Sequence, residues 1–516
     1  MSLGRRPIAN TIARWSGIGC GTLASVVLTP YLIQHLGDER FGIYQISRHL
    51  TLYVALLDFG LIASVMRFAS RAIASKDDQR LNEITSSALV LFSGIALAGF
   101  LACIVVARGA PGFFGVDEAY AMEMRWLFLG LGGWWAITML AIPARGVFIG
   151  HQRWGLLSFV TAGGWVLTVV AVIGLFETGH VGLQAVGLAF LIGGIFQLLA
   201  SHTIARLIQP TLRWSRRFVD RAILRTLYSF GLWNMLFAIS GLFLWSSDSI
   251  VIGRMLGPEV VPFYAIPFML IHYGRIVVLG FAAQMTPVAA AHAAENNTAG
   301  LRATLIRSTR IGLILTLAGN GILLLMVEDL LRLWVGARYA PSWIIYAGLM
   351  LSFWAVYANF SIHQILIGAG DIRAPAAITL IATLTTLMLK AVALGWFGAG
   401  IETLPLLNCV LVLPVVLIYI PWCACRLAGI SLIRLYREAY LGPILAFIPV
   451  AGAGWFVTRY LSPLNLIEFC ALFVLFASSY LLISLWTLSA SERASIVRMI
   501  KAPRASLQRP RTAAPD

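Results

Sequence analysis

The chain has 516 residues, of which 59% are hydrophobic and only 12% are charged, and its mean hydropathy is +0.85. Soluble proteins carry about 25% charged residues. This composition therefore excludes an ordinary soluble domain and predicts an all-α polytopic membrane protein. In a soluble protein the formal net charge of +16 would suggest nucleic acid. Here the arginines cluster in alternate loops, so we expect no nucleic-acid partner.

Fourteen apolar segments are candidate membrane spans, because a helix needs about 20 residues to cross the hydrocarbon core. They lie near residues 15–36, 41–66, 84–107, 126–149, 155–176, 182–205, 227–253, 260–284, 310–331, 342–367, 375–398, 403–425, 439–460 and 466–488. The sequence thus predicts about fourteen transmembrane helices, followed by a basic tail that its composition predicts to be disordered.

Basic residues gather in every second loop of this arrangement. The densest group follows the sixth span and consists of Arg206, Arg213, Arg216, Arg217, Arg221 and Arg225. The intervening loops are neutral or acidic, as at Asp38–Glu39 and Asp117–Glu118. Because Lys and Arg accumulate in cytoplasmic loops, we expect a multi-pass protein of the cytoplasmic (inner) membrane with both termini in the cytoplasm.

A short motif recurs at an offset of 220 residues, from His35–Tyr44 to Met255–Tyr264. The matching pairs are Leu36 with Leu256, Gly37 with Gly257, Glu39 with Glu259 and Tyr44 with Tyr264. This offset carries the first span onto the seventh, and an even number of spans per copy leaves both copies in the same orientation. We therefore predict two pseudo-symmetric six-helix bundles related by an axis along the membrane normal, plus two C-terminal helices.

This symmetry sets the expected domain bounds. They are a cytoplasmic N-terminus (1–14), an N-terminal bundle (15–205), a basic linker (206–226), a C-terminal bundle (227–425), spans thirteen and fourteen (426–488) and the tail (489–516). The linker mixes arginines with apolar residues, which suits a helix lying on the inner membrane surface. The alternative is a solvated basic loop.

Charged residues inside spans are the functional candidates, because an Arg, Lys or Asp at mid-span costs about 2.5 to 3.5 kcal/mol on insertion scales. In span two, helical spacing places five residues on one face: Tyr44, Arg48, Thr51, Ala55 and Asp58. The offset maps this stripe onto Tyr264, Phe268, Ile271, Arg275 and Val278, with His272 one helical step from Arg275. Span seven carries a matching stripe of Asn234, Ala238, Gly241, Trp245 and Asp248.

These stripes favour a cationic cavity with a few acids between the bundles. The alternative is that Asp58 and Asp248 only anchor the ends of their spans beside Arg67 and Arg254. Lys390 lies in the middle of span eleven and either pairs within the second bundle or takes part in transport.

Several signatures of enzymes are missing from the sequence. No lysine follows a glycine as a Walker A loop requires, and no HExxH, nucleophile elbow or metal-spaced Cys/His cluster occurs. Asp38 and Glu39 lie in a connection too short for the catalytic loop of a membrane glycosyltransferase. We expect no enzyme activity, no cofactor and no metal site.

Three stretches resemble the polysaccharide transporter family of the multidrug/oligosaccharidyl-lipid/polysaccharide exporter superfamily, the O-antigen type flippases. They are Thr29–Tyr44, Leu57–Phe68 and Asp248–Tyr264. The resemblance implies two bundles around a cavity lined largely by spans one, two, seven and eight. Relatives move an undecaprenyl-pyrophosphate-linked oligosaccharide to the outer leaflet, driven by an ion gradient, for polysaccharide or lipopolysaccharide biosynthesis.

Combined with the function that the resemblance implies, the residues of the polar stripes have hypothetical roles. Arg48, Arg275 and His272 would attract pyrophosphate or acidic sugars, and Tyr44, Thr51, Asn234, Trp245 and Tyr264 would line the cavity. Asp58 or Asp248 would carry the coupling ion, H⁺ or Na⁺. The other expected partners are membrane lipids and the polysaccharide polymerase machinery. Two alternatives stay open: a drug or small-cation antiporter on the same fold, and an intramembrane glycan-modifying enzyme.

Overall fold

The computed structural model describes residues 6–58, 61–220, 223–224, 232–461 and 464–487. The side chains of residues 6–16, 18, 63 and 232–238 also lie outside the described residues, as do the first five residues and the tail expected to be disordered. Every element in the described ranges is helical, with no strand among them. The prediction of an all-α fold is confirmed.

Nine helices in the described part of the chain are long and apolar enough to cross a membrane, or up to eleven if each of two bent pairs is one span. The protein is therefore a multi-pass membrane protein, although the predicted count of fourteen spans is not confirmed. The bent pairs are Glu118–Leu140 with Ile142–Gly150, at 43°, and Thr298–Leu324 with Val327–Trp334, at 67°. Both fall where a single continuous span was expected.

Contacts divide the chain into two units, of which unit 1 comprises residues 1–269 and 373–412. Its helices are α1 (Arg6–Val54), η1 (Ala55–Asp58), α2 (Leu61–Ala74), α3 (Asp78–Phe114), α4 (Glu118–Leu140), α5 (Ile142–Gly150), α6 (Trp154–Glu177), α7 (Leu183–Ile208), η2 (Arg216–Phe218), α9 (Leu232–Met255), η3 (Pro258–Val260), the first part of α10 (Val261–Ala282), α17 (Arg373–Gly395) and most of α18 (Thr403–Pro414).

Unit 2 comprises residues 270–372 and 413–516. After the end of α10 it contains α11 (Met285–Ala294), α12 (Thr298–Thr316), η4 (Leu317–Gly321), α13 (Ile322–Leu324), α14 (Val327–Trp334), η5 (Ala337–Ser342), α15 (Trp343–Ala358), α16 (Phe360–Ala369), η6 (Val415–Tyr419), α19 (Ile420–Ala428), α20 (Leu432–Leu435), η7 (Tyr436–Tyr440), α21 (Leu441–Leu461) and α22 (Leu466–Leu485). The segments η4, η6 and η7 are π-helical turns inside longer helices. The symmetric domain bounds expected from the repeat stay a prediction.

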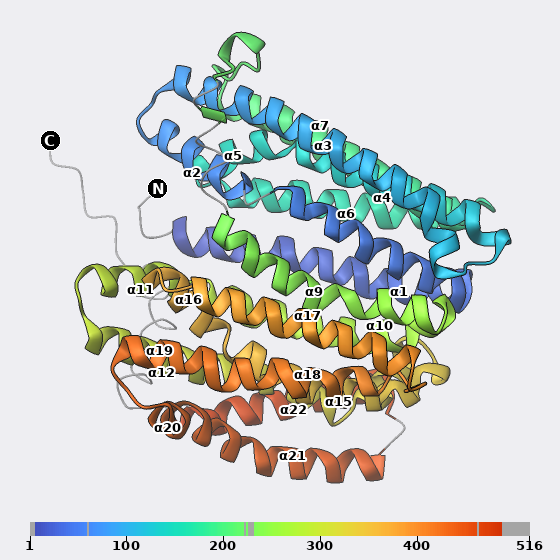
Figure 1. Cartoon of the computed structure of the whole chain (residues 1–516), viewed down its shortest axis with the longest axis vertical. Helices are drawn as coiled ribbons and strands as arrows, with labels where there is room; N and C mark the ends of the chain where they lie inside the picture. The colour runs from blue at the N-terminus through green and yellow to red at the C-terminus, as the bar shows by residue number, and fades with distance from the viewer. Residues whose placement is uncertain (1–5, 59–60, 221–222, 225–231, 462–463, 488–516) are drawn as a thin grey trace, which may run out of the picture. The chain divides into compact units, whose positions relative to one another are not determined.

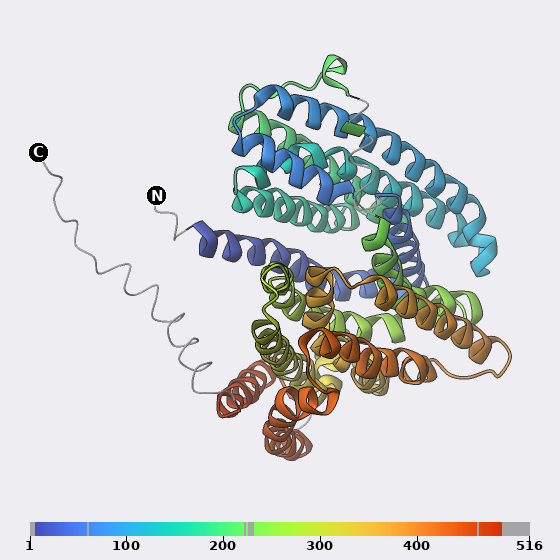
Figure 2. The same cartoon turned by 60° about the vertical axis from the view of Figure 1, so that its left-hand side comes forward.

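The repeated motif forms a break in the helix path in both copies. Gly37 interrupts α1 at φ 74° and ψ 178°, and Gly257 separates α9 from η3 at φ 98° and ψ 155°. This backbone region is almost restricted to glycine, which explains why the glycine recurs at the offset of 220 residues. Figure 2 shows the two segments of α1 at an angle to each other.

The two copies of the motif also touch each other within unit 1. A Cβ added to Gly42 would lie 1.8 Å from the carbonyl oxygen of Pro258, so the backbone of α1 lies directly against η3. One turn further along α1, Ile46 packs against Gly253 of α9. A Cβ added to Gly253 would lie 2.3 Å from Cδ1 of Ile46, so the absence of a side chain there makes room for Ile46. Small residues allow this close helix approach where lipid supplies no hydrophobic driving force.

Span two is not the continuous helix that we expected over residues 41–66. The α-helix ends at Val54 and a 3₁₀ turn, η1, covers Ala55–Asp58, before α2 begins at Leu61. Asp58 therefore does not share one α-helical face with Tyr44 and Arg48. A 3₁₀ turn has three residues per turn instead of 3.6, which rotates Asp58 off the expected stripe.

The described part of the linker, residues 209–220, is not the surface helix that its sequence favoured. After α7 ends at Ile208, residues 209–220 contain only the short turn η2 and pack on the start of α3. The Asn82 side chain donates to the carbonyl of Thr211 and accepts from the amide of Arg213, at 3.1 and 2.8 Å. Ser87 accepts from the amide of Asp220 at 3.0 Å. These bonds to α3 replace the internal bonds that a helix would have made.

The helices of unit 1 pack both against their neighbours in sequence and against distant helices. Figure 1 shows α3, α4 and α7 side by side. A Cβ on Gly130 of α4 would lie 2.5 Å from the Cα of Gly187 of α7, so these two backbones are in direct contact. Phe92 and Phe148 are fully buried in the core of this bundle. Elsewhere in this unit, α17 packs against α9 and brings two charged residues together.

Candidate functional site

The central polar group of unit 1 is a buried ion pair between α9 and α17. Lys390 Nζ lies 2.6 Å from Asp248 Oδ1, and the two side chains are only 3% and 4% exposed. The Tyr264 hydroxyl of α10 donates to Asp248 Oδ2. Lys390 thus supplies one partner and Tyr264 another, so both carboxylate oxygens of Asp248 are engaged.

The local sequence explains why the pair is buried. Asp248 is surrounded along α9 by the buried serines Ser246, Ser247 and Ser249, and Lys390 follows the buried Thr386 by one turn of α17. These small residues bring the two helices close enough for a direct bond. A buried pair of this kind has no net charge, and removing either member leaves an uncompensated charge in a low dielectric.

The repeat-related tyrosines are both buried. Tyr264 is 1% exposed and Tyr44 is 6% exposed, with the Tyr44 ring 6.4 Å from the ring of Phe190. Both were expected to line the cavity. In this structure Tyr264 instead contacts the ion pair and Tyr44 packs inside the N-terminal bundle. Their role in lining a cavity stays a prediction.

The other expected lining residues of unit 1 have separate environments. Trp245 lies one turn before Asp248 on α9, with its ring 6.3 Å from that of Phe268. Thr51 is buried and its hydroxyl donates to the carbonyl of Ser47. Asn234 belongs to α9, but its side chain lies outside the described residues.

The expected arginines are half-buried in helices of different units. Arg48 lies on the second segment of α1 in unit 1, and Arg275 lies on α10 in unit 2. Arg275 Nη1 is 3.2 Å from His272 Nε2, which agrees with the expected helical step. The Arg275 guanidinium also lies 5.7 Å from the centre of the Phe360 ring. That the two arginines face a common cavity stays a prediction.

One polar contact was missed by the sequence analysis. Arg145, which falls within the predicted span 126–149 and was not among the named candidates, lies on α5 with Nη2 2.7 Å from Oε1 of Gln197 on α7. Gln197 is 5% exposed in the middle of an apolar span. A lone glutamine at that position is the signal that would have indicated an internal polar partner.

Acidic residues cluster around the two copies of the repeated motif in unit 1. Partial burial raises the pKa of the Glu39 carboxyl, and the nearby Glu259 and Asp117 raise it further, against the lowering effect of Arg40. Arg40 is itself held by Glu123, with Nη2 2.6 Å from Oε1. Glu39 and Glu259 are the repeat-related acids, so the contact between the motif copies brings like charges together.

The fold is that of a known class of membrane transporters. The chain is similar to a multidrug resistance MATE family transporter of the MOP superfamily in an inward-facing conformation, with a TM-score of 0.69 and 16% identity over 82% of this chain and 99% of that one. It is also similar to the lipid II flippase MurJ in an inward closed conformation, with a TM-score of 0.67 and 15% identity over 95% and 100% of the two chains.

The chain belongs to the family described as "Polysaccharide biosynthesis protein", whose profile matches residues 8–290. This confirms the resemblance drawn from the motifs. The chain is also 21% identical over 427 residues to the uncharacterized membrane protein EpsK of Bacillus subtilis (strain 168), covering 82% of this chain and 84% of that protein.

Proposed function

We propose that the protein is a flippase that moves an undecaprenyl-pyrophosphate-linked oligosaccharide across the cytoplasmic membrane by alternating access. The observation that carries this proposal is the family match over residues 8–290 on a transporter fold. Polysaccharide biosynthesis requires a membrane-bound sugar intermediate to change sides. A multi-pass transporter in that family is suited to this step.

Arg48 and Arg275 are the proposed contacts for the pyrophosphate or for acidic sugars. Both lie half-buried on apolar helices, where a charged group is costly without a partner or water. A guanidinium is planar and donates in a fork that matches phosphate oxygens. His272 beside Arg275 would add a further polar group to the same substrate contact.

The pair of Asp248 and Lys390 is the proposed coupling site. Protonation of Asp248 would remove its negative charge and end the attraction to Lys390, which joins α9 to α17. Proton binding at Asp248 would therefore loosen the contact between α9 and α17. Of the two acids considered for coupling, Asp248 is favoured, because Asp58 lies in a 3₁₀ turn outside the regular helix. Na⁺ coupling remains the second option.

A drug or cation antiporter is the second candidate, and the similarity to MATE transporters favours it. The buried acid Asp248 is neutralised by Lys390, which weakens its attraction for a cationic drug. The half-buried arginines repel cations as well. An intramembrane glycan-modifying enzyme ranks third, because the solved structures that this chain resembles are those of transporters.

The proposal is tested by complementing a strain that lacks its own flippase. The wild-type chain should restore surface polysaccharide, and the Arg48→Ala/Arg275→Ala double variant should lose most of it at equal membrane abundance. Arg332→Ala is the matched control, since Arg332 is exposed and, among the described residues, bonds to Glu328 one turn away. Full surface polysaccharide from the double variant would contradict the proposed contact between these arginines and the phosphate. Drug efflux without a glycan phenotype would favour the antiporter.

A further inference from the structure

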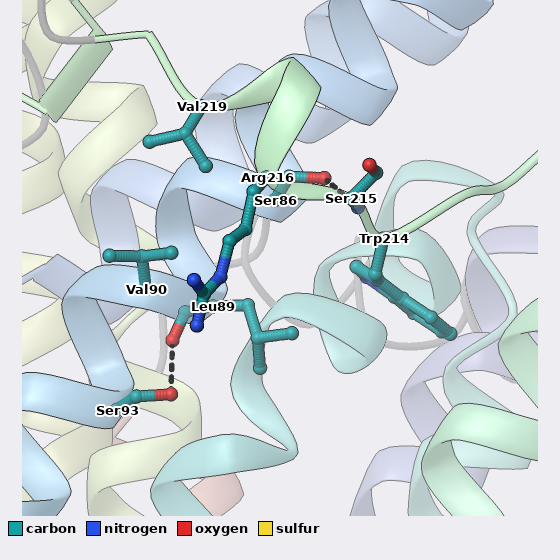
Figure 3. A pocket seen from close by; sticks show the side chains of 8 residues that line it. All are labelled: Ser86, Leu89, Val90, Ser93, Trp214, Ser215, Arg216 and Val219. Carbon is teal, nitrogen blue, oxygen red and sulfur yellow. Dashed lines mark hydrogen bonds between the residues drawn. The ribbon is translucent and has the colours of Figure 1, made fainter.

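A pocket of about 630 Å³ lies between the linker and the first turns of α3. Figure 3 shows its lining residues: Ser86, Leu89, Val90, Ser93, Trp214, Ser215, Arg216 and Val219. One wall is α3 and the other is the linker with its short turn η2. The pocket belongs wholly to unit 1 and is separate from the ion pair of Asp248 and Lys390.

Hydrogen bonds hold the linker wall in place. Ser86 Oγ accepts from the amide of Ser215 at 3.2 Å and donates to the carbonyl of Arg213 at 3.4 Å. Asn82, one turn earlier on α3, binds the linker through both atoms of its amide. The shape of the pocket is therefore preorganised, which lowers the entropic cost of filling it.

Arg216 gives the pocket its charge. The side chain is exposed, and within the described ranges it makes no ion pair. The nearest acid along the linker, Asp220, lies 3.8 Å from Arg80 instead. In Figure 3 the Arg216 side chain extends along α3 toward Ser93. The Ser93 hydroxyl donates to the carbonyl of Leu89, so its hydrogen is already bonded when an apolar chain lies beside it.

The apolar wall of the pocket continues as a stripe on the outer face of α3. Val90 is 48% exposed, and helical spacing places Leu97, Leu101 and Val105 on the same face with exposures of 61, 51 and 69%. Between Glu83 and Arg108 the helix carries no charge, over a length of about 36 Å at 1.5 Å per residue. Ser86 lies about 5 Å into this stretch, near the boundary between headgroups and hydrocarbon, and Ser93 lies about 10 Å deeper.

We propose that this pocket binds the phosphate headgroup of an anionic phospholipid, with one acyl chain lying along the stripe from Val90 to Val105. Arg216 contacts the phosphate, the acyl chain passes Ser93, whose hydroxyl is bonded to the carbonyl of Leu89, and Trp214 lies at the interface depth that tryptophan favours. A soluble anion would use the arginine but not the stripe. The occupant that matches both is a lipid.

The test is native mass spectrometry of the full-length protein titrated with phosphatidylglycerol. Arg216→Ala should weaken binding at least about tenfold, because it removes a charge-assisted hydrogen bond to the phosphate. Arg217→Ala is the matched control, because Arg217 is an exposed neighbour that does not line the pocket, and its loss should stay below about twofold. Ser93→Trp, which fills the pocket and keeps the charge, should also weaken binding.

Three outcomes would overturn the proposal. Equal losses of lipid binding in Arg216→Ala and Arg217→Ala would show that the lipid is attracted by net charge and does not occupy a specific site. Unchanged binding in both Arg216→Ala and Ser93→Trp would exclude the pocket. Displacement of the lipid by glycerol phosphate at similar concentration would identify a site for soluble phosphate. Equal melting temperatures of all variants establish that each is folded.

Discussion

The ion pair of Asp248 and Lys390 gives the sharpest prediction at the scale of single residues. Lys390→Met should lower stability strongly, by about 3 to 5 kcal/mol, because it leaves a buried carboxylate without its counter-charge. Asp248→Asn/Lys390→Met removes both charges and should recover most of the loss, since well-packed neutral pairs are often as stable as buried ion pairs. Thermal unfolding of the purified protein in detergent measures both.

The matched control for this pair is Lys76→Met, which removes an exposed lysine from the turn after α2. It should change stability by less than about 0.5 kcal/mol. Additive losses in the Asp248 and Lys390 double variant would contradict a direct interaction. If the pair couples transport, the double variant will be stable but will no longer complement the flippase-deficient strain.

The acids around Glu39 predict a specific pH dependence. The folded protein raises the pKa of Glu39, through burial and then through Glu259 and Asp117. A carboxyl with a raised pKa contributes stability below its unfolded pKa, and that contribution is lost as the pH rises through the folded pKa. Glu39→Gln should therefore raise the melting temperature relative to wild type at pH 8, and this gain should vanish near pH 4.

Glu402→Gln is the control for this experiment, since it removes an exposed carboxyl outside the cluster. An equal gain in Glu402→Gln at pH 8 would mean that general charge reduction explains the effect. A gain for Glu39→Gln that grows toward pH 4 would contradict the sign derived from the raised pKa.

At the scale of elements, the contact between the two motif copies is the critical packing feature. Gly42→Ala should destabilise the protein, because its Cβ would lie 1.8 Å from the backbone oxygen of Pro258, which has little freedom to move. We expect a loss of about 1 to 3 kcal/mol, typical of overpacking. Gly94→Ala is the matched control on α3, where an added Cβ meets nothing within 4 Å.

The control has the opposite expected sign. Gly94 lies inside a regular helix, so alanine should be neutral or stabilising by up to about 1 kcal/mol. Thermal unfolding of both variants in the same detergent is the measurement. Similar melting temperatures for Gly42→Ala and wild type would show that α1 and η3 do not touch as described.

The sequence was sufficient to predict the helical class and the repeated break. Composition and apolar length require membrane helices, and the recurrence of Gly37 as Gly257 marks two turns with the same backbone geometry. It was not sufficient to predict where the spans are interrupted. The turn at Ala55–Asp58 carries neither proline nor glycine, so its local sequence does not indicate the end of a helix, and the π segment at Leu317–Gly321 has two glycines but no proline.

The linker shows why local pattern misled at this scale. Arginines mixed with apolar residues favour an amphipathic helix, but the backbone of residues 209–220 bonds to side chains of α3. Asn82, Ser86 and Ser87 are separated from it by more than 120 residues in sequence, as from Asn82 to Arg213. Periodicity within a segment cannot reveal partners at that distance.

At the scale of the whole molecule, the loop charges predict the orientation in the membrane. In a cysteine-free background, Glu118→Cys should react with an impermeant maleimide added outside intact cells, and Arg217→Cys should react only after the membrane is opened. Glu118 is exposed at the start of α4 and Arg217 is exposed in the linker. Labelling of Arg217→Cys in intact cells would contradict the predicted topology.

The candidate site was only partly predictable. Charged residues within apolar spans identified Asp248, Lys390 and Arg275 as unusual, because each is costly in hydrocarbon. Which of them pair depends on helix neighbours, and the sequence does not place α17 beside α9. The bond between Lys390 and Asp248 therefore required the structure, as did the burial of Tyr264.

The most direct test of the proposed function is translocation in proteoliposomes that contain the purified chain. The substrate is a fluorescent undecaprenyl-pyrophosphate-linked oligosaccharide, and its exposure on each leaflet is measured under an imposed proton or sodium gradient. We predict gradient-dependent translocation above protein-free vesicles, reduced at least about tenfold in Arg48→Ala/Arg275→Ala, since one charge-assisted hydrogen bond contributes about 1.5 to 3 kcal/mol. Translocation no faster than in protein-free vesicles, with gradient-driven export of a cationic drug by the same preparation, would contradict the account.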